Sequence, residues 1–174
     1  MKTDLKLFAV LLGGSARGAM VELHDMTFVA APTIEAAYPQ LKEKWFGTRS
    51  SCHVDSWMEL NQIDGYDVTL VPEAQATPPL PGSPQLFFVN VGSYPKGRLE
   101  ESHTYLFLVG NDAKAVKNRA TKLGPDGHFL PHKDNLEIVD QIIAVDSVSG
   151  YRIRLTQNAY VHVENPIQSD YRPL

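Results

Sequence analysis

The chain has 174 residues, of which 43% are apolar and 21% are charged, and its net charge is −4. An average apolar content and a small net charge exclude a disordered chain, and the length suits one domain or two small halves that share a core. The acidic balance argues against a general nucleic-acid binder, which needs a basic excess to displace counterions from phosphates. The single cysteine, Cys52, cannot form an internal disulfide, so a reducing cytoplasm is the expected location.

The N-terminal segment resembles a signal peptide only at its start, where Lys2 and Lys6 flank Asp4. The apolar run LFAVLL that follows is too short for the core of a signal peptide or for a membrane span. We therefore expect a strand that ends at Gly13-Gly14, and we expect no membrane partner.

The sequence matches itself without a gap over Leu7–Ile63 when it is shifted by 79 positions. LFAVLLGGSARG aligns with LFFVNVGSYPKG, and four of the six histidines fall in the matched pairs His24/His103 and His53/His132. After an insertion of six residues the match resumes, with IDGYDVTL over VSGYRIRL. These matches predict an internal duplication.

The duplication divides the chain into four segments. We predict a first module over residues 1–71, a proline-rich linker over 72–85, a second module over 86–156 and a C-terminal extension over 157–174. Five of the fourteen linker residues are proline, which favours an extended, semi-rigid connector.

Each module is predicted to fold as strand, strand, helix, strand, strand. Thr33 and Asp112 are the expected helix N-caps, and apolar residues follow each of them at helical spacing. Pro39 within the first helix predicts a kink or a late helix start. The dipeptides Asp64-Gly65 and Ser149-Gly150 predict tight hairpins between the last two strands of each module.

A module of about seventy residues buries only a marginal core by itself. We therefore expect the two modules to pack on each other about a pseudo-two-fold axis, as two subunits of a homodimer do. The predicted fold class is α+β, with two tandem ββαββ modules and mainly antiparallel sheets. The segment YVHVE, residues 160–164, is expected to add an edge strand. The aromatic residues Trp45, Phe46 and Trp57 are expected in the core at the seam between the modules, and aromatic residues that line a ligand-binding groove are the alternative.

The string LFAVLLGG…ELHDMTFV…WFG…HVDSW…IDGY resembles an uncharacterised bacterial family, the domain of unknown function 1543. Members of that family carry one or two copies of the domain. The first module fits the pattern closely, with Glu22, His24 and His53 in place, whereas the second has Thr104 at the position of Asp25. The family name implies no activity, so the resemblance supports the module boundaries and leaves the chemistry open.

The strongest candidate site is the repeated pair of motifs Glu-x-His and His-x-Asp. Side chains two residues apart on a strand share one face, so Glu22 lies with His24, and His53 with Asp55. If the two strands are neighbours, two imidazoles and two carboxylates meet at a cross-strand separation of about 5 Å. The second module offers the corresponding residues Glu101, His103, His132 and Asp134.

More than one chemistry fits these residues. The predicted metal ligands, for zinc or ferrous iron, are His24, His53, His103, His132 and Asp134. Glu22 and Asp55 would then be the catalytic carboxylates, or a carboxylate could fix the tautomer of a histidine that acts as a general acid and base. A half-buried histidine on a strand also commonly bonds a carboxylate for structural reasons alone, and retention in both modules fits that interpretation.

Nothing in the sequence demands catalysis. We therefore expect a non-enzymatic module that binds a small molecule or another protein and that contains structural His–carboxylate pairs. The alternative is a zinc- or iron-dependent enzyme that uses the repeated sets. Cys52 and His53 do not make a nucleophile–base pair, because adjacent side chains on a strand point to opposite faces. A monomer and a homodimer both fit the sequence.

Overall fold

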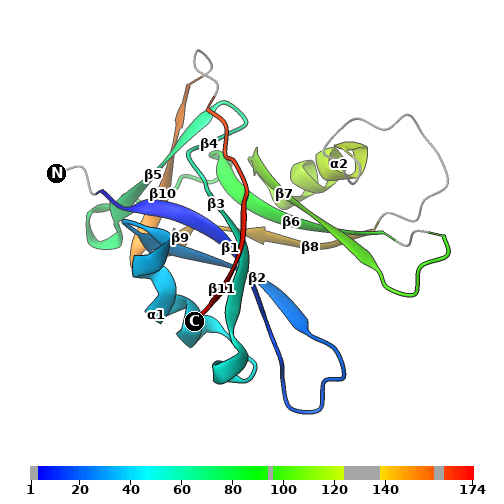
Figure 1. Ribbon diagram of the computed structural model, residues 1–174. Helices are drawn as coiled ribbons and strands as arrows, with labels where there is room; N and C mark the ends of the chain where they lie inside the picture. The colour runs from blue at the N-terminus through cyan, green and yellow to red at the C-terminus, as the bar shows by residue number, and fades with distance from the viewer. Residues whose placement is uncertain (1–3, 94–95, 124–137, 159–162) are drawn as a thin grey trace. The chain divides into compact units, whose positions relative to one another are not determined.

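The computed structural model describes residues 4–93, 96–123, 138–158 and 163–174. These residues form two α-helices and eleven strands, all labelled in Figure 1. The helices are α1 (Ile34–Lys44) and α2 (Ala113–Leu123). The strands are β1 (Lys6–Gly14), β2 (Leu23–Ala31), β3 (His53–Glu59), β4 (Gln62–Ile63), β5 (Tyr66–Pro72), β6 (Gln85–Ser93), β7 (Ser102–Gly110), β8 (Ile138–Ala144), β9 (Ser147–Val148), β10 (Tyr151–Gln157) and β11 (Gln168–Pro173). All the strand pairs are antiparallel, so the predicted α+β class is confirmed.

The chain divides into two compact units. The first unit contains Met1–Ala76 and Ser147–Leu174, and the second contains Thr77–Asp146. Strands β9 and β10, which the sequence repeat assigns to the second module, therefore belong to the unit that holds β1 to β5. Neither described helix has the length and apolar character that a membrane-spanning helix requires.

One sheet of the first unit has the strand order β11-β3-β1-β2, and α1 packs against it. The hydroxyl of Thr33 accepts the N–H of Ala36, so α1 begins directly after its predicted cap and continues through Pro39. Trp45 is 4% exposed and lies in the core of this unit, as predicted. The prediction for Phe46 is wrong, since this residue is 60% exposed and places its ring against that of Trp45.

The other sheet of the first unit has the order β4-β5-β10-β9. Thr69 on β5 lies opposite Arg154, the residue 85 positions further along the sequence. The pairing is symmetric about this position, because Tyr66 lies opposite Gln157 and its counterpart Tyr151 lies opposite Pro72. This sheet therefore has a local two-fold relation between the strands that end the two repeats.

Tight hairpins precede both β5 and β10. Asp64 and Gly65 have φ angles of 53° and 77°, and Ser149 and Gly150 have φ angles of 53° and 81°. Two successive residues with positive φ are what two-residue hairpins of the primed type require. Both hairpin predictions are confirmed.

The second unit contains a sheet with the order β7-β6-β8, against which α2 packs. The Oδ1 atom of Asp112 accepts the N–H of Ala115 at 2.7 Å, which confirms the predicted helix cap. Strands β6 and β7 and helix α2 begin 79 residues after β1, β2 and α1 and have the same lengths. The described part of this unit thus repeats the strand, strand, helix order of the first.

The third strand of the repeat recurs at a different offset. Phe8 on β1 lies opposite Glu59 on β3, and the equivalent Phe87 on β6 lies opposite Ala144 on β8. Strands β3 and β8 are therefore 85 residues apart, and the six extra residues precede β8 instead of following Ile63. The predicted position of the insertion is wrong.

The corrected offset also changes the residues that correspond to His53 and Asp55. Ile138 on β8 holds the strand position of His53, because each lies opposite the equivalent glycine of its partner strand. Asp140 likewise replaces Asp134 as the counterpart of Asp55. His132 and Asp134 themselves lie outside the described residues.

The C-terminal segment supplies an edge strand at a place that the sequence did not indicate. Strand β11 pairs with β3, with Gln168 opposite Trp57 and Pro173 opposite His53. Three of the five residues of the predicted edge strand YVHVE, residues 160–162, lie outside the described part of the chain.

Candidate functional site

The two predicted motifs of the first unit meet where β1 passes between β2 and β3. Gly13 on β1 lies opposite His24 on β2 and opposite His53 on β3. A Cβ atom at position 13 would collide with His53 Nε2 and would lie 2.7 Å from Asp55 Oδ2. The glycine therefore provides the space in which the polar side chains of both neighbouring strands meet.

A β-bulge in β3 positions Asp55. The register between β1 and β3 shifts between Leu11 and Leu12, which lie opposite Ser56 and Val54. Asp55 is the extra residue and has no partner opposite it on β1. Bulges of this kind redirect a side chain locally and recur next to functional sites.

Pairwise contacts join four side chains, in the order Glu22, His53, Asp55 and His24, and this set is here called the His–carboxylate network. His53 Nε2 lies 3.0 Å from Glu22 Oε1 and 3.2 Å from Asp55 Oδ1, and Asp55 Oδ2 lies 3.3 Å from His24 Nε2. The side chains at the two ends, Glu22 and His24, are 51% and 45% exposed, whereas that of His53 is 5% exposed. The network thus has a buried centre and two half-exposed ends.

One hydrogen bond and two close polar contacts surround the ring of His53. Its Nδ1 atom lies 3.0 Å from the carbonyl oxygen of Ser51, which can only accept, so Nδ1 carries a hydrogen and donates it. Its Nε2 atom lies at ion-pair distance from the carboxylate oxygens of Glu22 and Asp55.

Strand β11 lies beside the buried centre of the network, His53. The ring of Tyr171 stacks on that of His53, with centroids 4.5 Å apart and an interplanar angle of 41°. The next residue, Arg172, places its guanidinium 4.5 Å from the centroid of the Trp57 ring and also bonds Glu35 on α1. The C-terminal strand therefore fixes the histidine from one side and joins β3 to α1.

The second unit retains part of the same arrangement. His103 Nδ1 donates to Asn90 Oδ1 at 3.1 Å and lies 3.5 Å from Asp140 Oδ2, while its Nε2 lies 3.8 Å from Glu101 Oε2. Asp140 is the extra residue of a bulge between Asn90 and Val91, as Asp55 is in the first unit. Sequence comparison missed Asp140 because an unbroken offset of 79 pointed to Asp134.

No group of three or more His, Cys, Asp or Glu side chains in the described residues is arranged to hold a metal ion. The shortest contacts of the His–carboxylate network lead from Glu22 through His53 and Asp55 to His24. Asp55 Oδ2 is buried and makes no hydrogen bond to another described residue. One carboxylate oxygen at the centre of the network is therefore unsatisfied.

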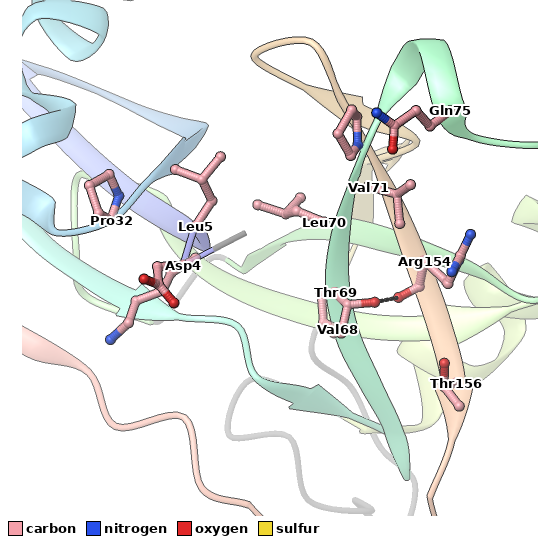
Figure 2. Close-up of a pocket in the computed structure, with 12 residues that line it drawn as sticks. Asp4, Leu5, Pro32, Val68, Thr69, Leu70, Val71, Gln75, Arg154 and Thr156 are labelled. Carbon is pink, nitrogen blue, oxygen red and sulfur yellow. Dashed lines mark hydrogen bonds between the residues drawn. The ribbon is translucent and has the colours of Figure 1, made fainter. Parts of the chain in front are cut away.

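A pocket of about 930 Å³ lies in the same unit, at the opposite end of β1. The start of β1 and the residue after β2 form one side, and β5 and β10 form the other (Figure 2). Figure 2 shows Leu5 and Leu70 extending toward each other from the two sides. The lining residues are Asp4, Leu5, Lys6, Pro32, Val68, Thr69, Leu70, Val71, Pro72, Gln75, Arg154 and Thr156. No sequence pattern indicated this pocket, because four distant segments of the chain contribute to it.

Comparison with known proteins supports the fold and leaves the activity open. The family model of the Domain of Unknown Function (DUF1543) matches residues 19–70, which include all four residues of the His–carboxylate network. A solved structure, described as the crystal structure of a protein Il1583 from Idiomarina loihiensis, is 28% identical in sequence, covers 98% of both chains and superimposes with a TM-score of 0.70. A comparison with curated proteins finds no match.

Proposed function

We propose that this protein is a non-enzymatic binding module for a small molecule in the cytoplasm, and that the pocket between β1, β5 and β10 is its binding site. The volume of about 930 Å³ carries this proposal, because pockets that enclose small ligands measure roughly 300–1,000 Å³. The lining combines apolar side chains with a few polar groups, which is the usual composition of such sites.

The two kinds of lining residue occupy different parts of the pocket. Leu5, Pro32 and Leu70 provide apolar surface near the start of β1 and on β5. Arg154 and Thr156 on β10 provide a charge and a hydroxyl, and both residues are exposed. Since Arg154 pairs directly with Thr69, the two polar side chains lie on the face of the sheet opposite to Leu70.

The His–carboxylate network has a structural role in this proposal. Its buried member, His53, bonds the carbonyl of Ser51, lies within 3.2 Å of the carboxylates of Glu22 and Asp55, and packs against Tyr171. These contacts join β3 to the start of β2 and to β11. We further propose that the chain arose by duplication of one ββαββ unit, since the equivalent elements recur at offsets of 79 and 85 residues.

Titration of the isotopically labelled protein with 1-octanol, followed by NMR, tests the binding site. We expect the largest amide shifts at residues that line the pocket, such as Leu5, Leu70 and Thr156. The exposed position of Pro32 allows Pro32→Tyr, which should fill the apolar part of the pocket and abolish the shifts while the fold is kept. Octanol shifts centred elsewhere, or unchanged in this variant, would refute the proposed site.

A metal-dependent enzyme is the second candidate, and one observation favours it. The Nδ1 atom of His53 donates to a backbone carbonyl, as metal-bound histidines commonly do, while its Nε2 faces two carboxylates. Metal analysis of protein purified without a histidine tag separates the two candidates. Near-stoichiometric zinc or iron that disappears in a folded His53→Ala variant would favour the enzyme over the binding module.

A further inference from the structure

We infer that the outer edge of β8 is a docking site for an extended acidic segment of a partner protein, which adds to the sheet as an antiparallel strand. β8 ends the strand order β7-β6-β8, and it pairs with β6 alone among the described residues. This edge belongs to the second unit, whereas the pocket belongs to the first, so the inference does not depend on the proposed function.

The equivalent strand of the first unit already carries a strand on this edge. β3 corresponds to β8, and β11 covers the outer edge of β3. The pairing of β11 with β3 continues on both sides of the bulge at Asp55. The similar bulge at Asp140 therefore does not prevent an antiparallel strand from pairing with β8.

The edge of β8 is exposed and has little protection against pairing. Gln141, Ile143 and Ala144 are exposed, and the exposed fraction of Ile143 is 48%. The strand sequence IVDQIIA contains neither lysine nor proline, which commonly protect exposed edges. Its charged residue, Asp140, directs its carboxylate across the sheet to within 3.5 Å of His103 Nδ1. The backbone N–H and C=O groups of such an edge are available to an incoming strand.

The charge of the partner follows from the contacts of β11 in the first unit. Arg172 on β11 donates to Glu35 and to the hydroxyl of Tyr38, both on α1. Its guanidinium also lies 4.5 Å from the centroid of the Trp57 ring on β3. An acidic helix residue and an aromatic ring therefore favour a cation at this position of the added strand.

The corresponding helix positions of the second unit are basic. At the offset of 79 residues, Lys114 replaces Glu35 and Lys117 replaces Tyr38 on α2, which packs against β8. Both lysines are exposed, and neither forms an ion pair with a residue that the structure describes. A strand on β8 would therefore meet two cations on the side of α2.

The strand position of Trp57 also changes. Ile142 replaces Trp57 on β8, because each lies opposite the equivalent valine of the central strand. An arginine at the place of Arg172 would thus find no aromatic ring and would face two lysines, whereas a carboxylate would be attracted by both.

The two faces of β8 indicate the pattern of the partner segment. Val139 and Ile142 pack into the core beneath α2, and Ile143 lies on the opposite face because adjacent side chains alternate. A segment with acidic residues on the α2 side and apolar residues over Ile143 would match both faces. We therefore expect alternating acidic and apolar residues in the partner.

Two peptides of equal length test this inference, acetyl-TVEVEVT-amide and acetyl-TVKVKVT-amide. NMR titration of the full-length labelled protein should show that the acidic peptide shifts the amides of Gln141 and Ile143. We expect the acidic peptide to bind about tenfold more tightly than the basic one, because two attractive charge contacts become repulsive. Its affinity should fall as the salt concentration increases.

Charge reversal on α2 should reverse this preference. The double variant Lys114→Glu with Lys117→Glu changes two exposed side chains, so it should fold and bind the basic peptide more tightly. Lys44→Glu is the matched control, because Lys44 is an exposed lysine of α1 in the first unit and its change should preserve the preference for the acidic peptide.

Methylation of alternate backbone N–H groups of the acidic peptide separates strand addition from charge attraction. Methyl groups on the set of residues that faces β8 should abolish binding, whereas methyl groups on the other set should leave it unchanged. Equal affinities of the acidic and basic peptides, shifts centred outside β8, or binding that survives both methylation patterns would overturn the inference. A dimer of the free protein that the acidic peptide dissociates would assign the edge to a second copy and would also overturn it.

Discussion

Gly13 lies directly beneath the imidazole of His53, and the two residues face each other across the β1–β3 pair. A methyl group at position 13 would occupy the space that the ring fills. The equivalent Gly92 lies beneath the carboxylates of Glu101 and Asp140. Both units thus use a glycine to admit polar side chains, but only the first admits a buried ring.

Gly13→Ala should destabilise the protein by about 1–3 kcal/mol, the usual cost of overpacking. His53 cannot move aside easily, because Ser51 and Asp55 hold its two nitrogens and its side chain is 5% exposed. Urea unfolding measures the difference. Gly92→Ala is the matched comparison and should cost less, since the side chain of Glu101 is 27% exposed and can turn toward solvent. Equal losses in the two variants would contradict this explanation.

His53→Ala should cost about 2–4 kcal/mol, because it removes a buried ring and leaves the carboxylate of Asp55 and the carbonyl of Ser51 without their partner. His24→Ala should cost less than about 1 kcal/mol, since the His24 side chain is 45% exposed. Chemical denaturation of both variants at neutral pH checks the order. A His24 variant as unstable as the His53 variant would show that the exposed end of the network also supports the fold.

The stability of the first unit should depend on Glu35 at acid pH. A hydrogen bond from its own backbone N–H, followed by one from Arg172, lowers the pKa of Glu35 from its ordinary value of 4.5. The stabilisation is therefore complete above pH 4.5 and is lost as the pH falls through the lowered pKa of the folded state. Glu35→Gln should remove this loss, so its curve of stability against pH should be flatter below pH 4.5. Parallel curves for the two proteins would exclude the contribution of Glu35.

Cys52 should react slowly with thiol reagents in the folded protein. The residue is 2% exposed, and burial raises the pKa of its thiol, although the charge of Lys42 opposes the shift. The low exposure and the raised pKa both reduce the amount of accessible thiolate, which is the reactive form. Labelling with iodoacetamide, monitored by mass spectrometry, should be much faster in denaturant than in buffer. Similar rates in the two conditions would show that the core around Cys52 opens readily.

Local sequence signals were sufficient for most elements of the fold. Helix caps and tight turns involve only nearby backbone groups, so the residue types at these positions identify them. The caps are Thr33 and Asp112, and the turns are Asp64-Gly65 and Ser149-Gly150. Phe46 shows the limit of this approach, because an aromatic side chain beside a buried tryptophan can equally face solvent. Strand β11 has no apolar alternation, and its position depends on contacts with β3.

The candidate site was predictable for one unit and not for the other. Glu22 and His24 meet His53 and Asp55, as strand alternation suggested. In the second unit, matching histidines led the sequence comparison to Asp134, whereas the pairing of β8 with β6 places Asp140 beside His103. An insertion before a strand is invisible when chance identities continue across it, and the hydrogen-bond register is what reveals it.

Strand β10 completes a sheet whose other long strand, β5, is made some eighty residues earlier in synthesis. The ribosome therefore synthesises all of the second unit before it synthesises the last strands of the first unit. Contacts so distant in sequence form slowly, because a long loop must close before they stabilise anything. Although its first strand emerges first from the ribosome, the N-terminal unit is the last to acquire all of its strands.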